Sequence, residues 1–193
     1  MNLPDDFFTA DLHLGHNNII KYVDRPFSNI QEHDTYIINQ WNDVVGDNSR
    51  VYVLGDFTLG GKAVACNFFA QLKGKIYVIG NHFHHDRHWL PPYPWFGDLP
   101  EMVSRTHYRI TVVPPSYVIE YRALNNNQGY PLAVHLSHHP LAVWDRKHYG
   151  AWHLHGHSHG HYTARGKILD VGVDTHAFRP WSLAEIQSYM EAR

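Results

Sequence analysis

Three short apolar segments in the first eighty residues each end in polar side chains, and helical patterns separate them. The segments span 7–11, 50–56 and 75–82, and they end in Asp11, in Asp56 and in the pair Asn81 and His82. Between them, apolar side chains recur at helical spacing over 30–45 and 64–72. Because right-handed crossovers join parallel strands, this order predicts a β-α-β-α-β unit with parallel strands.

The second half of the chain is richer in strand patterns. Segments 108–113, 117–123 and 131–137 favour strands, and the turn-like residues 125–129 predict an antiparallel hairpin. A further strand is expected at 167–173, and Ser182 opens a capping box before a short final helix. A second capping box is expected at Ser28, whereas residues 84–100, rich in proline, are expected to form an irregular loop.

Together these patterns predict an α/β fold in a single domain spanning 1–193. Early parallel strands and later antiparallel strands favour a four-layer α-β-β-α sandwich, in which two stacked mixed sheets are flanked by helices. A chain of 193 residues with 44% hydrophobic side chains can build such a core.

Charge and cysteine content narrow the possible partners and locations. Lys and Arg number 16 against 18 Asp and Glu, so no global basic field is present to hold a long nucleic acid. Cys66 is the only cysteine, which excludes a disulfide within the chain. The amino terminus has no leader-like pattern and no segment approaches a membrane span, so we expect a cytoplasmic protein without membrane contact.

Histidine is the compositional outlier, with 18 residues, and five of them alternate along 153–161. In an extended segment, alternate side chains point to the same side, so this run could turn several imidazoles toward one transition-metal ion. A solvated loop or a metal-sequestering tract is the alternative interpretation. The strand ends favour the metal site, because ligands bind outside the carboxyl ends of parallel strands.

Five short blocks follow one another along the chain in a specific order. They are Asp11-Leu-His13, Gly55-Asp56, Gly80-Asn81-His82, His138 and Gly156-His157-Ser158-His159. In this order the chain resembles the calcineurin-like metallophosphoesterase superfamily across residues 11–159. It is most similar to the short single-domain bacterial and phage members.

The resemblance implies a centre of two metal ions with mixed carboxylate, amide and imidazole ligands. It assigns Asp11, His13 and His159 to the first ion, Asn81, His138 and His157 to the second, and Asp56 to both. His138 is preferred over its neighbour His139. Mn²⁺ is the favoured metal, and Fe, Zn²⁺ or Ni²⁺ also suit this donor set.

The activity implied is hydrolysis of a small phosphodiester or phosphomonoester, with a nucleotide-like substrate preferred, by a hydroxide held between the metals. His82 would be the general acid, and His16 would contact the substrate phosphate. An acidic residue often follows Gly-Asn-His in this superfamily, but here Phe83 does, so Asp86 is the candidate partner for His82. The alternatives are a Mn²⁺-dependent nuclease of the same superfamily and a catalytically weak metal-binding scaffold. His85 is assigned a surface or structural role.

Overall fold

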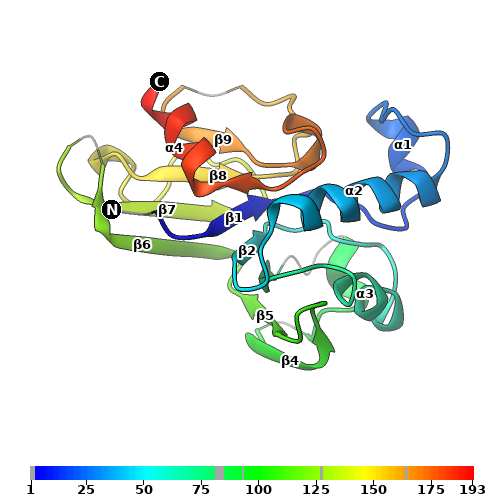
Figure 1. Cartoon of the computed structure of the whole chain (residues 1–193). Coiled ribbons are helices and arrows are strands. Elements are labelled where there is room, and N and C mark those ends of the chain that lie inside the picture. Colours follow the sequence, from blue (N-terminus) through cyan, green and yellow to red (C-terminus); the bar gives the residue numbers. More distant parts are fainter. Residues whose placement is uncertain (1–2, 81–84, 93, 127, 164) are drawn as a thin grey trace.

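The fold is built on two stacked β-sheets of mixed strand direction (Figure 1). The computed structural model describes residues 3–80, 85–92, 94–126, 128–163 and 165–193. The predicted ligand Asn81 and the predicted general acid His82 lie outside these ranges. The α/β fold with two mixed sheets and flanking helices agrees with the prediction from sequence.

The larger sheet has the strand order β10-β1-β2-β3-β5-β4. Its strands are β1 (Asp6–Thr9), β2 (Arg50–Val53), β3 (Lys75–Ile79), β4 (Gly97–Val103), β5 (Arg109–Val113) and β10 (Trp181–Ser182). The four central strands are parallel, and β10 and β4 run antiparallel at the two edges. The β-α-β-α-β unit is therefore confirmed.

The smaller sheet has the order β6-β7-β8-β9. Its strands are β6 (Ser116–Asn125), β7 (Pro131–Ser137), β8 (Trp152–His155) and β9 (Ile168–Asp170). The hairpin of β6 and β7 is confirmed. In addition, β7, β8 and β9 are mutually parallel, which the sequence did not predict. Figure 1 shows the arrows of β1 and β7 pointing the same way, so their carboxyl ends lie at one end of the molecule.

Four α-helices and three short 3₁₀ turns occur in the described part of the chain. They are α1 (Ile19–Tyr22), α2 (Ile30–Val44), α3 (Lys62–Phe69), α4 (Leu183–Glu191), η1 (His85–His88), η2 (Lys147–Tyr149) and η3 (Val173–Thr175). The capping box of α4 forms as predicted. The predicted cap at Ser28 is wrong by one residue, because the Asn29 side chain accepts the bond from the Glu32 amide.

Two large apolar clusters of the described residues hold the sheets and helices together, beside a smaller one around Trp144. One lies between the larger sheet and the helices α2 and α3, with Trp41 and Phe69 fully buried. The other lies between the two sheets and includes Phe8, Leu154 and, from α4, Ile186. Each such side chain stabilises the fold by about 1.5–3 kcal/mol when buried. The site residues therefore project from a rigid double layer.

The predicted irregular loop over 84–100 is wrong at both ends. Residues 85–88 form η1, and β4 begins at Gly97 and pairs with β5. Pro100 is tolerated in β4 because this strand lies at the edge of the sheet, where a missing amide donor costs little. Among the helices of the described ranges, none has the length and apolar character that crossing a membrane requires.

Candidate metal centre

Strands from both sheets deliver polar side chains to one end of the molecule. Asp11 follows β1 and Asp56 follows β2, whereas His138 follows β7 and His157 follows β8. Backbone and side-chain contacts join the sheets at this point. Ala10 forms a parallel bridge with Gly172, and the Nδ1 atom of His138 donates to the carbonyl of Leu54 at 2.9 Å. The predicted ligands that the structure describes therefore share one location.

Five predicted ligands have left-handed backbone conformations. Their φ angles lie between 47° and 67°, and the residues are Asp11, His13, Asp56, His157 and His159. This region is unfavourable for side chains with a Cβ atom, although Asp and His are among the residues that enter it most often. Such strain persists where surrounding contacts enforce it, typically at functional sites. Here it turns the side chains inward at the point where each strand ends.

Asp11, His13 and His159 form one group that could hold a metal ion. One ligand atom from each residue lies within 4.8 Å of the others. Asp11 and His13 are buried, and His159 is partly exposed. The backbone amide of His157 donates to both carboxylate oxygens of Asp11, at 3.0 and 2.8 Å, which holds that carboxylate in place. These three residues are the predicted ligands of the first ion.

His138, His139 and His157 form a second group with the same spacing limit. His138 is buried and the other two are exposed. His138 also belongs to a group with Asp11 and Asp56, which His139 does not. The preference for His138 therefore agrees with its position, while His139 lies close enough to be an additional donor.

Asp56 lies between the two groups. Its Oδ2 atom is 3.7 Å from Nε2 of His13, and its Oδ1 atom is 3.6 Å from Nε2 of His138. Each carboxylate oxygen therefore faces a different imidazole. This is the arrangement expected of a carboxylate that serves two cations, because its two oxygens can be shared between them.

The pKa values of two buried carboxylates of the site, Asp11 and Asp56, are raised in the protein alone. Burial raises the pKa of Asp11 well above its ordinary value, and the nearby Asp56 and Asp170 raise it further. Burial, together with the charge of Asp86, raises the pKa of Asp56 to about 7. Bound cations would remove this penalty by favouring the charged form of both carboxylates.

His13 has the properties of a ligand rather than of a core histidine. It is 2% exposed, and no group in the described ranges hydrogen-bonds either of its ring nitrogens. Burial and the nearby Arg25 lower its pKa well below the ordinary value, so the ring is neutral near pH 7. A buried polar atom usually has a partner, and a metal ion would supply one here.

Asp174 and Arg25 hold the site residues in place; the sequence indicated a structural role for Asp174 but neither its partners nor the role of Arg25. The Nδ1 atom of His159 donates to Asp174 at 2.7 Å, which leaves Nε2 available to an ion. Arg25 is buried and donates to both oxygens of Asp174, at 2.8 and 2.7 Å. It also donates to the carbonyls of Asp11 and Leu12. One guanidinium therefore joins the loop after β1 to the partner of His159.

Asp170 and two glycines shape the remaining backbone of the site. Asp170 accepts hydrogen bonds from the hydroxyl of Ser158 and from the amides of Gly160 and Gly172, at 2.6–2.9 Å. A Cβ atom on Gly172 or on Gly156 would lie 2.7 Å from Oδ2 of Asp11. The carboxylate of Asp11 therefore occupies space that only glycine leaves open.

The alternating histidine run divides into two parts with different roles. His153 and His155 lie in β8 and are buried, and burial lowers the pKa of His153 to about 4. His153 accepts from the amide of Leu141 and donates to the carbonyl of His135, so it is structural. The extended conformation ends at His155, and the residues that follow form a turn. Of the five imidazoles in this run, those of His157 and His159 belong to the groups that could hold a metal ion.

His85 is the main correction to the predicted site. It was assigned a surface or structural role, but its Nε2 atom lies 3.6 Å from Oδ2 of Asp56. It also groups with His13 and His16, the predicted substrate contact. The Oδ1 atom of Asp86 accepts from the amides of Phe57 and Thr58, and this side chain is fully buried. Its predicted support of His82 stays a prediction, since His82 lies outside the described ranges.

Comparison with known proteins extends over nearly the whole chain. No protein-family model matches it. It is 27% identical over 201 aligned residues to an uncharacterised protein of Methanocaldococcus jannaschii, covering 99% of this chain and 94% of that protein. It is 28% identical to the Gene 66 protein of Mycobacterium phage D29, covering 87% of each. A solved structure of a protein of unknown function from Aquifex aeolicus matches with a TM-score of 0.59 at 18% identity, over 95% of this chain and 98% of that one. This last likeness bears on the fold alone.

Proposed function

We propose that this protein is a two-metal phosphoesterase of the calcineurin-like metallophosphoesterase superfamily. The proposal rests on one observation above all, the position of Asp56 between His13 and His138 with one carboxylate oxygen near each. Asp11, His157 and His159 complete the two groups on either side. We infer that small phosphodiesters or phosphomonoesters are the substrates, that Mn²⁺ is the preferred metal and that Fe, Zn²⁺ or Ni²⁺ can replace it. A cytoplasmic location is part of the same proposal.

The chain supplies charge and orientation at this site. When bound, two ions would polarise a phosphoryl group and lower the pKa of a water molecule between them. Asp11 and Asp56 offset the positive charge of such ions, and the amide of His157 fixes the orientation of Asp11. Asp174 fixes the ring of His159. His82 stays the predicted general acid, which would protonate the leaving oxygen.

A cavity of about 500 Å³ supports the choice of a nucleotide-like substrate. Its lining includes Trp95, Leu99 and Met102, together with His88 from the end of η1. His85 at the start of η1 faces Asp56, and a 3₁₀ helix rises roughly 2 Å per residue, so the two ends of η1 are about 6 Å apart. The aromatic side chains of the cavity could stack on a base, which is why a nucleotide-like substrate is preferred in this proposal.

The experiment that tests the proposal measures metal content and hydrolysis together. Wild-type protein should bind two Mn²⁺ ions and hydrolyse bis(p-nitrophenyl) phosphate or p-nitrophenyl phosphate, and EDTA should abolish the activity. Asp56→Asn should lose metal and activity together, because the amide lacks the charge and one of the two acceptor oxygens. Asp47→Asn, at an exposed turn, is the matched control and should change neither.

Each outcome bears on a specific part of the proposal. Two bound ions without hydrolysis of either ester would contradict the phosphoesterase assignment and favour a metal-binding scaffold. Degradation of single-stranded nucleic acid with Mn²⁺ would instead favour the nuclease. An Asp56→Asn variant that keeps both ions would refute the bridging role. Loss of turnover in His82→Ala with both metals retained is expected if His82 is the general acid.

A further inference from the structure

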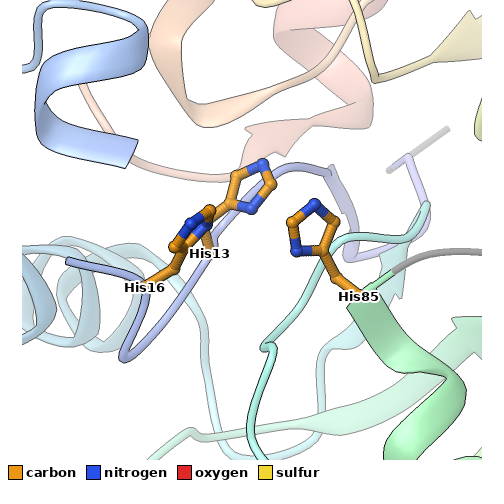
Figure 2. A group of neighbouring side chains, drawn as sticks. All are labelled: His13, His16 and His85. Atoms are coloured by element: carbon orange, nitrogen blue, oxygen red, sulfur yellow. The ribbon is translucent and has the colours of Figure 1, made fainter. Parts of the chain in front are cut away.

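Three imidazoles gather on one side of the candidate centre, and the predicted two-ion site uses only one of them as a ligand. Figure 2 shows His13, His16 and His85, which come from the loop after β1 and from the start of η1. The ring centroids of His13 and His85 are 4.6 Å apart, and that of His16 lies 5.3 Å from His85. One nitrogen from each ring lies within 4.8 Å of the others. This spacing suits three ligands of one ion.

The two segments that carry these rings are attached to the same stretch of backbone. The amide of Leu14 donates to the carbonyl of Phe57 at 2.9 Å, and the hydroxyl of Thr58 donates to the carbonyl of Leu14 at 2.7 Å. From the other side, the carboxylate of Asp86 accepts from the amide of Phe57 at 3.0 Å. Because both segments are fixed to residues 57–58, the three imidazoles are held together before any ligand binds.

The three imidazoles differ in their exposure to solvent. His13 is buried, whereas His16 and His85 are partly exposed, so an ion can reach the group from outside. The Nδ1 atom of His16 is buried, and within the described ranges no group hydrogen-bonds to it. A buried ring nitrogen in this position indicates a ligand that the protein itself does not provide.

The donor set differs in kind from those on the other side of His13. Each of the groups that contain Asp11 includes its carboxylate, which suits Mn²⁺, whereas this group, like that of His138, His139 and His157, consists of imidazoles alone. Neutral nitrogen donors favour the later transition metals, with affinity rising from Mn²⁺ to Ni²⁺ and Cu²⁺ and remaining high for Zn²⁺. The carboxylate of Asp56, 3.6 Å from Nε2 of His85, adds favourable charge nearby.

We propose that His13, His16 and His85 form an alternative metal position that takes Zn²⁺ or Ni²⁺ in preference to Mn²⁺. An ion held there uses His13, which the first ion of the proposed pair also needs. It also occupies His16, the predicted phosphate contact. Zn²⁺ in excess over Mn²⁺ therefore competes with the working pair and inhibits the proposed phosphoesterase. Only this inhibition rests on the proposed function, because the metal preference follows from the donors alone.

The test compares metal affinities, which do not depend on catalysis. Zn²⁺ and Mn²⁺ dissociation constants would be measured by chelator competition for the wild type and for His16→Gln/His85→Gln. Losing two of three donors should weaken Zn²⁺ binding by at least about 100-fold, beyond what loss of an outer partner costs. Mn²⁺ binding should change less than about threefold. The control is His107→Gln/His148→Gln, which removes two exposed histidines and should alter neither constant.

The outcomes separate this proposal from the proposed function. Unchanged Zn²⁺ affinity in the His16/His85 variant would overturn it, and so would an equal loss of Zn²⁺ and Mn²⁺ affinity. Histidine ¹⁵N NMR gives a second measurement, in which Zn²⁺ should shift the ring signals of His16 and His85 in the wild-type protein. A protein that shows these shifts without hydrolysing any phosphoester would support the alternative position and refute the phosphoesterase.

Discussion

Asp174 offers the sharpest test of how this site is organised, because one carboxylate serves two partners. It accepts from the buried guanidinium of Arg25 at two atoms and from Nδ1 of His159. The change Asp174→Asn keeps the size of the side chain and removes its charge. It also replaces one acceptor oxygen with a donor. Both Arg25 and His159 then face an amide that satisfies them incompletely.

Asp174→Asn should change two measurable quantities, the free energy of unfolding and the affinity for metal ions. The side chain of Arg25 is 0% exposed and that of Asp174 is 12% exposed, so the variant leaves a buried charge without its counterion. Breaking such a pair typically costs 3–5 kcal/mol, and because Asn keeps one acceptor we expect a loss of about 3 kcal/mol in the free energy of unfolding. Loss of the partner of His159 should weaken metal binding about 10–100-fold, or roughly 1.4–2.7 kcal/mol.

The contribution of Asp174 to the free energy of unfolding should depend on pH. Burial alone would raise the pKa of Asp174, but the hydrogen bonds from His159 and Arg25 outweigh it and lower the pKa below the ordinary 3.8. A carboxylate with a lowered pKa in the folded state stabilises the protein above the pKa of the unfolded state. Its contribution is therefore present above pH 3.8 and declines as the pH falls below that value.

Two measurements check these magnitudes. Urea denaturation of metal-free protein, repeated from pH 7 down to pH 3, gives the free energy of unfolding, and calorimetric titration with Mn²⁺ gives the affinity. Asp47→Asn provides the exposed control and should match the wild type in both. If Asp174→Asn unfolds within about 0.5 kcal/mol of the wild type at pH 7, or binds Mn²⁺ equally well, the inferred role of Asp174 is wrong.

Two further changes test the backbone of the site and the final helix. Gly156→Ala places a Cβ atom 2.4 Å from that of Ala10 and 2.7 Å from Oδ2 of Asp11, so metal affinity measured by titration should fall at least about tenfold. Gly61→Ala has nothing within 4 Å and should leave it unchanged. Glu185→Gln keeps an acceptor for the capping box of α4 but removes the charge that pairs with Arg179, and should cost about 0.5 kcal/mol of unfolding free energy at pH 7. Hydrogen bonds lower the pKa of Glu185 against the effect of burial, so this difference should shrink as the pH falls below 4.5, whereas a constant difference would contradict the assignment.

Much of this architecture could be predicted because its signals are local. Strands that end in Asp11 and Asp56 can be read from apolar segments followed by an acid, and their convergence follows from parallel pairing. The same reasoning placed His138 at the end of a strand. The cap of α2 was missed by one residue because Ser28 and Asn29 are both good caps, and only the tertiary course of the chain chooses between them.

The parts that could not be predicted depend on contacts between distant segments. His85 reaches Asp56 only because Asp86 fixes η1 to residues 57–58, and nothing in the local pattern indicates that attachment. Arg25 and Asp174 are 149 positions apart in the sequence, and no local pattern indicates that they pair. β4 was missed because Pro100 argues against a strand wherever its edge position is unknown.

The division of the ligands between two sheets has a mechanical consequence. Asp11, His13 and Asp56 belong to the larger sheet, while His138, His157 and His159 belong to the smaller one. The predicted ligands of the first ion, Asp11, His13 and His159, come from both sheets, so an ion bound there would link the two layers. Metal removal should therefore speed amide hydrogen exchange along β7 and β8 more than along β2 and β3. The affinity of the centre for metal ions would then reflect the strength of the contact between the two sheets.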